Sequence, residues 1–212
     1  MKNSRRIMLS TFGAVMGLAG IEHGTGEVLQ GNTAPGGLMF PSWPNAAFFR
    51  SLNGEPAISL VPNLLATGIL AILFSLIFAI WSIGFIRARR SGRILIGLSI
   101  AMLLTGAGVF PPLFGILIGA GASTLHSSPK ARRSRLLENA SQIMGSLWPW
   151  FFGASVISWL AMIPGIPALD YFFGIQNPTA ILILLACMFG FIILAWISAG
   201  FRDLGGPFPA GA

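Results

Sequence analysis

Long apolar runs recur along the whole of this 212-residue chain, and short polar or basic segments separate them. An α-helix rises 1.5 Å per residue, so about 20 apolar residues cross the hydrocarbon of a bilayer. The pattern predicts an all-α, polytopic helical membrane bundle that forms a single integral membrane domain. We expect six membrane segments, at about residues 6–27, 58–86, 94–109, 112–125, 143–163 and 178–201.

The run Ile94–Leu125 allows two interpretations, because it is too long for one straight span. Its middle holds Gly106, Gly108, Pro111 and Pro112, and adjacent prolines disfavour a continuous helix. One kinked helix would give five membrane segments, whereas a tight helical hairpin would give six. The segment 112–125 is short for a full crossing, and a re-entrant half-helix there would give the same topology as the hairpin.

The distribution of basic residues favours six segments. In that topology both termini are cytoplasmic, and twelve of the 13 Lys and Arg residues lie on the cytoplasmic side, with Arg50 outside. Five segments would place six of the cations outside. The basic loops that mark this topology contain Arg87, Arg89, Arg90, Arg93, Lys130, Arg132, Arg133 and Arg135.

Composition supports a membrane protein. Only 9% of the residues are charged and the mean hydropathy is +0.79, whereas soluble domains carry about 25% charged residues. The Lys and Arg residues that give the net charge of +7 lie at the ends of apolar runs. This placement is typical of residues that set membrane topology and contact anionic headgroups. We therefore expect a cell-membrane protein whose partner is the lipid bilayer, and not a protein that binds nucleic acid.

The two ends of the chain carry few signals. The basic start could precede a cleaved signal peptide, but we expect a retained helix, because membrane segments follow throughout. Residues 204–212 are rich in Gly and Pro and are expected to form a flexible tail.

The chain has a single cysteine, Cys187, which excludes an intramolecular disulfide.

The first helix carries a stripe of glycines. Spacings of 4, 3 and 4 place Gly13, Gly17, Gly20 and Gly24 on one face, where another helix can approach closely. We expect this face to mediate helix packing, either within the chain or in a homo- or hetero-oligomer.

The same helix ends with the chain's most unusual polar cluster. Glu22, His23 and Glu27 are costly near a bilayer core, so they are candidates for binding a ligand or a proton. His23 and Glu27 share a helix face, whereas Glu22 points nearly opposite the glycines. Asn63, at the start of the next segment, is expected at the same depth and completes the candidate set. No second histidine is expected on the outer side of the membrane, so the sequence assigns no metal site, and it leaves any cofactor unknown.

Several activities are disfavoured. No span contains a lysine for a Schiff base, and the sequence has no phosphate-binding glycine loop and no Gly-Xaa-Ser-Xaa-Gly elbow. The leading hypothesis is a non-enzymatic membrane protein that transports a small solute, a proton or a cation through an outer-leaflet polar site. The alternatives are an accessory or structural subunit of a membrane assembly, and a membrane-embedded enzyme that binds a metal or other ligand.

Overall fold

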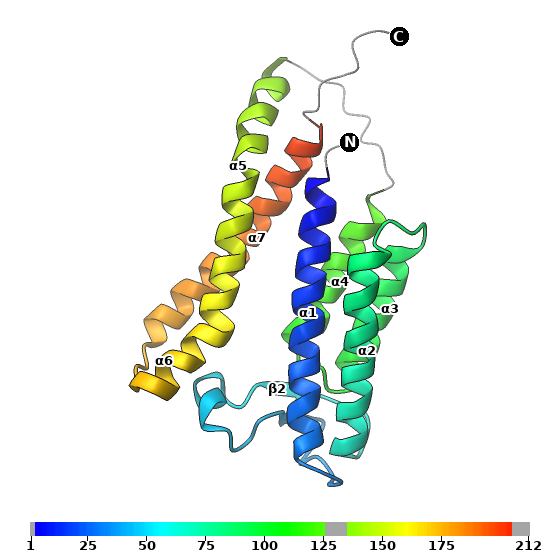
Figure 1. Ribbon diagram of the computed structural model, residues 1–212, viewed down its shortest axis with the longest axis vertical. Helices are drawn as coiled ribbons and strands as arrows, with labels where there is room; N and C mark the ends of the chain where they lie inside the picture. Colours follow the sequence, from blue (N-terminus) through cyan, green and yellow to red (C-terminus); the bar gives the residue numbers. More distant parts are fainter. Residues whose placement is uncertain (1–2, 126–134, 205–212) are drawn as a thin grey trace. The chain divides into compact units, whose positions relative to one another are not determined.

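The computed structural model describes residues 3–125 and 135–204, with side chains described for 3–125 and 142–203. This part of the chain is mostly helical and contains seven α-helices (Figure 1). The chain divides into two compact units. The first unit is Leu9–Ser127, and the second unit is formed by Met1–Met8 together with Ser128–Ala212. The tail after residue 204, together with Lys130, Arg132 and Arg133, lies outside the described residues.

Helices α1 and α2 of the first unit pack against each other through small residues. Helix α1 covers Ser4–Leu29 and α2 covers Leu64–Gly84. A Cβ built on Gly68 of α2 would lie 2.5 Å from the carbonyl oxygen of Gly24, so the two backbones touch where both residues are glycine. The other glycines of α1 face progressively earlier residues of α2, which makes the pair antiparallel: Gly13 faces Ser82, Gly17 faces Ala79 and Gly20 faces Ser75.

The run that allowed two interpretations folds as a hairpin of two helices. Helices α3 (Ser91–Leu104) and α4 (Phe110–Ser123) lie side by side, with Gly92 against Gly119 (Figure 1). Both prolines lie in the first turn of α4, where a missing N–H costs little. Each helix has 14 residues, or about 21 Å, which is shorter than the hydrocarbon core.

The connection between α1 and α2 is ordered. Strand β1 (Met39–Pro41) pairs antiparallel with β2 (Pro56–Ile58), and a 3-10 helix, η1 (Ala47–Leu52), lies between them. The backbone of residues 58–60 is hydrogen-bonded to the α3–α4 turn, through Gly106 N to Ile58 O and Leu60 N to Leu104 O, both 3.0 Å. The connection and the turn are therefore held together.

Helix α2 starts later than expected. The hydrophobic pattern suggested a start near Ile58, but Ile58 belongs to β2, and Asn63 caps the helix by accepting a 2.9 Å hydrogen bond from Ala66 N. An N-cap side chain of this kind satisfies one of the free N–H groups at a helix start. The apolar residues at 58–61 therefore serve the sheet and the turn.

The second unit contains the longest helical segment. Helix α5 (Arg135–Leu160) continues through a π-helical turn (Ala161–Gly165) into α6 (Ile166–Phe173). We expected Pro164 to end this helix near residue 163. The wider π turn instead accommodates the missing N–H, and the helix ends at Gly174 with a φ of 65°.

Helix α7 (Pro178–Leu204) packs along α5 and completes the second unit. At its end, Arg202 lies over the Trp148 ring at 5.0 Å, and Asp203 accepts a 3.0 Å hydrogen bond from Ser4 N and a 3.2 Å bond from Arg5 N. Asp203 therefore binds free N–H groups at the start of α1, in the manner of an N-cap.

Among the described residues, three helical segments are long and apolar enough to cross a membrane: Leu64–Gly84, Gln142–Phe173 and Pro178–Asp203. This finding supports a helical membrane protein.

Candidate functional site: a buried histidine between carboxylates

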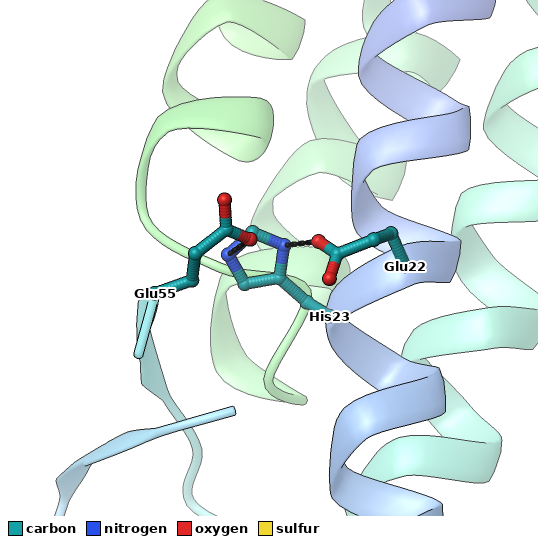
Figure 2. A group of neighbouring side chains, drawn as sticks. All are labelled: Glu22, His23 and Glu55. Carbon is teal, nitrogen blue, oxygen red and sulfur yellow. Dashed lines mark ion pairs between the residues drawn. The ribbon is translucent and has the colours of Figure 1, made fainter. Parts of the chain in front are cut away.

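The imidazole ring of His23 lies between two glutamates (Figure 2). Its Nδ1 atom is 3.1 Å from Oε2 of Glu22, and its Nε2 atom is 3.5 Å from Oε2 of Glu55. Nδ1 also lies 2.9 Å from the carbonyl oxygen of Ala19, one helical turn earlier. His23 is only 8% exposed, so the surrounding protein holds the ring in place.

Glu55 is the member of this cluster that the sequence analysis missed. It directly precedes β2 and has a φ of 54°, the third left-handed residue in a row after Asn53 and Gly54. Such backbone is uncommon for residues other than glycine. The turn brings the carboxyl group to His23 and leaves Glu55 only 7% exposed. The one available signal was the Asn-Gly dipeptide, which marks a turn but not where the next side chain goes.

The electrostatics of Glu55 follow from this burial. Loss of water around the carboxylate, together with the neighbouring Glu22 carboxylate, raises the pKa of Glu55 to about 8, although His23 opposes the shift. A carboxylate in this setting gains more from a nearby cation than it would in water.

Glu27 lies one helical turn after His23 and is fully buried. Its Oε1 atom accepts a 3.4 Å hydrogen bond from the hydroxyl of Ser42, in the connection. In the part of the chain with described side chains, Oε2 of Glu27 has no hydrogen-bond partner. The pairing of His23 with Glu27 that the helix periodicity suggested is therefore not the main contact of the ring, which instead contacts Glu22 and Glu55.

The α3–α4 turn covers both buried groups. Gly106 and Gly108 have φ values of 91° and 78°, a region that favours glycine. A Cβ on Gly106 would lie 2.3 Å from Glu27 Oε2, and one on Gly108 would lie 2.5 Å from His23 Nε2. The two glycines thus allow the turn to rest directly on the carboxylate and the imidazole.

The glycines that flank Thr25 explain how a helix can place these groups. Gly24 faces α2, as described above, whereas a Cβ on Gly26 would lie 2.4 Å from Ser42 O and 2.7 Å from the Trp43 ring. Close packing on both sides of α1 therefore brings α2 and the connection around Glu22, His23 and Glu27. Thr25 itself bonds back to Ile21 O, 2.8 Å away, at an exposed position.

The other residues that the sequence singled out lie outside the Glu22–His23–Glu55 cluster. Asn63 caps α2, and its amide nitrogen donates to the side chain of Asn32. The α1 glycines contact α2. Arg87, Arg89, Arg90 and Arg93 are exposed around the start of α3, and for Arg135 only the backbone is described.

A shallow cavity of about 440 Å³ lies beside Glu27, lined in part by Gly26, Gln30, Ser42 and Trp43. Its residues overlap the packing around Glu27, since Ser42 both lines it and bonds to that carboxylate. Glu27 thus lies close to an opening of the first unit.

Comparisons with protein-family models, with curated proteins and with solved structures find no match for this chain. The chemistry of the site therefore has to be argued from its own residues. One ligand atom from each of Glu22, His23 and Glu55 lies within 4.8 Å of the other two. Such a group can share a proton, hold a metal ion or form a structural ion pair.

Proposed function

We propose that the protein is a multi-pass membrane protein that binds a cation at the Glu22–His23–Glu55 cluster and carries it across the bilayer. The observation that carries this proposal is the burial of His23 between two carboxylates. Buried charges are rare in membrane proteins and mark ion or proton pathways.

The charge balance favours a cation as the ligand. Glu22, Glu27 and Glu55 supply three carboxyl groups within one end of the first unit, and once all three are ionised a protonated His23 can offset one negative charge at most. A bound cation would offset another in a place where water cannot.

The proposal includes a topology of six membrane segments, α1, α2, α3, α4, α5 with α6, and α7, with both termini in the cytoplasm. Helix α1 is long enough to span, at 26 residues and about 39 Å, although it carries charges. The short helices α3 and α4 cross as a hairpin, or enter and return with the same topology. The exposed arginines around the start of α3 support the cytoplasmic side for that end of the first unit.

Proteoliposomes test the transport proposal. One set of vesicles contains a pH-sensitive dye and a second set contains a dye sensitive to divalent metal ions, and an inward gradient of the matching cation is applied to each. We expect the wild type to carry one of these cations faster than empty vesicles do, and His23→Gln to abolish that flux. Thr25→Ala is the matched control, because it alters an exposed position on the same turn of α1.

The controls decide the interpretation. Equal reconstitution of all variants has to be verified by protein content and by thermal unfolding. The absence of flux for both cations in the wild type, or full flux in His23→Gln, would refute transport through this cluster.

A further inference from the structure

We infer that the cation of this site is a proton held between Nε2 of His23 and Oε2 of Glu55, and that the carboxyl group of Glu22 exchanges this proton with water. The inference rests on the proposed cation site and names its ion. It does not require that the proton be carried across the bilayer.

The Nδ1 side of the imidazole ring already carries a hydrogen. Nδ1 lies 2.9 Å from the carbonyl oxygen of Ala19, which can only accept, and 3.1 Å from Oε2 of Glu22. The lone pair of the neutral ring is therefore on Nε2. Because the carbonyl oxygen holds the hydrogen on Nδ1, an additional proton has to bind at the opposite nitrogen.

Nε2 faces a second atom that lacks a hydrogen. Oε2 of Glu55 lies 3.5 Å from Nε2, on the side of the ring opposite to Glu22 (Figure 2), and it has no hydrogen-bond partner among the described side chains. Hydrogen bonds between nitrogen and oxygen are usually about 2.7–3.2 Å long. Two acceptors therefore face each other, and a proton on either one would turn their contact into a hydrogen bond.

The α3–α4 turn covers the face of the ring and leaves the direction of the lone pair open. A Cβ built on Gly108 would lie 2.5, 2.7 and 2.9 Å from Nε2, Cδ2 and Cε1 of His23. Such similar distances place the turn above the ring, since an atom in the ring plane beyond Nε2 would be much closer to the nitrogen than to either carbon. The lone pair lies in the ring plane, so the turn does not occupy the position of the proton.

Two facing atoms suit a proton and not a metal ion. A metal ion at Nε2 would have Glu55 beside it, but Glu22 lies at the other nitrogen of the ring. Metal sites usually take three or more protein ligands, whereas a proton needs only a donor and an acceptor. When the proton moves from Glu55 to Nε2, the O–H bond breaks and the lone pair of the nitrogen forms the N–H bond. The resulting imidazolium then lies between two carboxylates.

The surroundings favour uptake of a proton near neutral pH. Burial of Glu55 and the neighbouring Glu22 carboxylate raise the pKa of Glu55 to about 8, and His23 opposes this shift. The other titratable group of α1 at this place is Glu27, which is also acidic. Helix α2 and residues 105–109 of the turn contain no titratable side chain. One added proton therefore reduces the negative charge of a cluster that has no fixed cation.

Glu22 connects the buried pair to water. Its side chain is 32% exposed, whereas that of Glu55 is 8% exposed. One oxygen atom of Glu22 lies within 4.8 Å of one oxygen atom of Glu55, a distance that a single water molecule can bridge. We therefore expect Glu22→Gln to slow the exchange of the proton and to leave its binding position in place.

Nitrogen NMR of the purified full-length protein in detergent tests the inference. The chain has two histidines, so labelled histidine in a His126→Asn background reports His23 alone. We expect Nδ1 to keep its hydrogen throughout a pH titration, and the Nε2 signal to change near pH 8 as the shared proton leaves. In Glu55→Gln the change near pH 8 should be lost, whereas Thr25→Ala should titrate as the wild type does.

Thermal unfolding guards against variants that fail to fold. The pKa of Glu55 is raised from 4.5 to about 8 in the folded chain, so the folded chain binds more protons than the unfolded chain between these values. The unfolding temperature of the wild type should therefore fall more steeply over this pH range than that of Glu55→Gln. Equal slopes in the two proteins would contradict a proton on Glu55.

The NMR titration and the vesicle assay separate the inference from the proposed function. An Nε2 signal that stays constant through the titration, or one that changes in the same way in Glu55→Gln, would overturn the inference. Flux of a divalent metal ion that depends on His23, with a constant Nε2 signal, would refute the inference and leave the proposed function standing. A proton titration at Nε2 without any flux would do the reverse.

Discussion

The α3–α4 turn is the most sensitive point at which to perturb the site, because Gly108 rests on the His23 ring. Gly108→Ala introduces two separate effects. The backbone at position 108 has a φ of 78°, and placing a residue with a Cβ in this conformation destabilises the fold by about 1–2 kcal/mol. The new methyl group would also lie 2.5 Å from Nε2 and 2.7 Å from Cδ2 of His23, and such overpacking costs about 1–3 kcal/mol.

Gly31 provides a matched control for the backbone effect alone. Its φ is 81°, almost the same as that of Gly108, but a Cβ there would have no neighbour within 4 Å. Gly31→Ala should therefore cost about 1–2 kcal/mol, and Gly108→Ala about 2–5 kcal/mol. The difference of about 2 kcal/mol corresponds to about 4–8 °C in unfolding temperature for a chain of this size.

Thermal unfolding in detergent, followed by size-exclusion chromatography with fluorescence detection, measures the two variants side by side. Cation binding measured on the same samples should fall in Gly108→Ala and stay unchanged in Gly31→Ala, because only the first displaces the imidazole. Equal unfolding temperatures and equal cation binding in the two variants would refute the argument that the turn rests on His23.

Three further predictions concern helix packing, helix capping and topology. Gly68→Ala should destabilise the protein by about 1–3 kcal/mol, because its methyl group would meet a backbone oxygen of α1 at 2.5 Å. Gly97→Ala, whose methyl group would have no neighbour within 4 Å, should be neutral or stabilising. Thermal unfolding measures both variants. Asp203→Ala should lower the free energy of unfolding by about 1–2 kcal/mol, because the hydrogen bonds from Asp203 to the start of α1 are lost. Asp203→Asn keeps an acceptor oxygen and should lower the free energy of unfolding less. Denaturant titration compares the two variants. In a Cys187→Ser background, Ser134→Cys should resist a membrane-impermeant thiol reagent in intact cells and react after permeabilisation; labelling in intact cells would contradict six segments.

Much of the helical architecture could be predicted from the chain alone. Apolar runs located the helices, and the glycine-proline segment between α3 and α4 allowed the hairpin that the structure contains. Boundaries were less predictable, because Ile58, Leu60 and Val61 are apolar whether they end a strand and enter a turn or start a helix. The helix through Pro164 was also hidden, since one extra residue in a π turn leaves no mark in the hydrophobic pattern.

All members of the candidate site except Glu55 could be predicted in the same way. Glu22, His23 and Glu27 were conspicuous because ionisable groups are costly in an apolar helix. Their pairing was not predictable, because helical projection describes Cα directions, whereas the long side chain of Glu22 reaches the neighbouring ring. Nothing in the local sequence around Glu55 indicates that its carboxyl group lies at His23.

The sequence by itself determined a helical membrane protein with a buried acid and histidine cluster at the end of its first helix, because hydrophobicity and helical spacing are local properties. Only the tertiary structure decided which groups meet. Glu55 reaches His23 because three left-handed residues turn the connection inward, and Gly106 and Gly108 allow a distant turn to close over the cluster. Those contacts depend on how separate segments pack, and no periodicity along one segment encodes them.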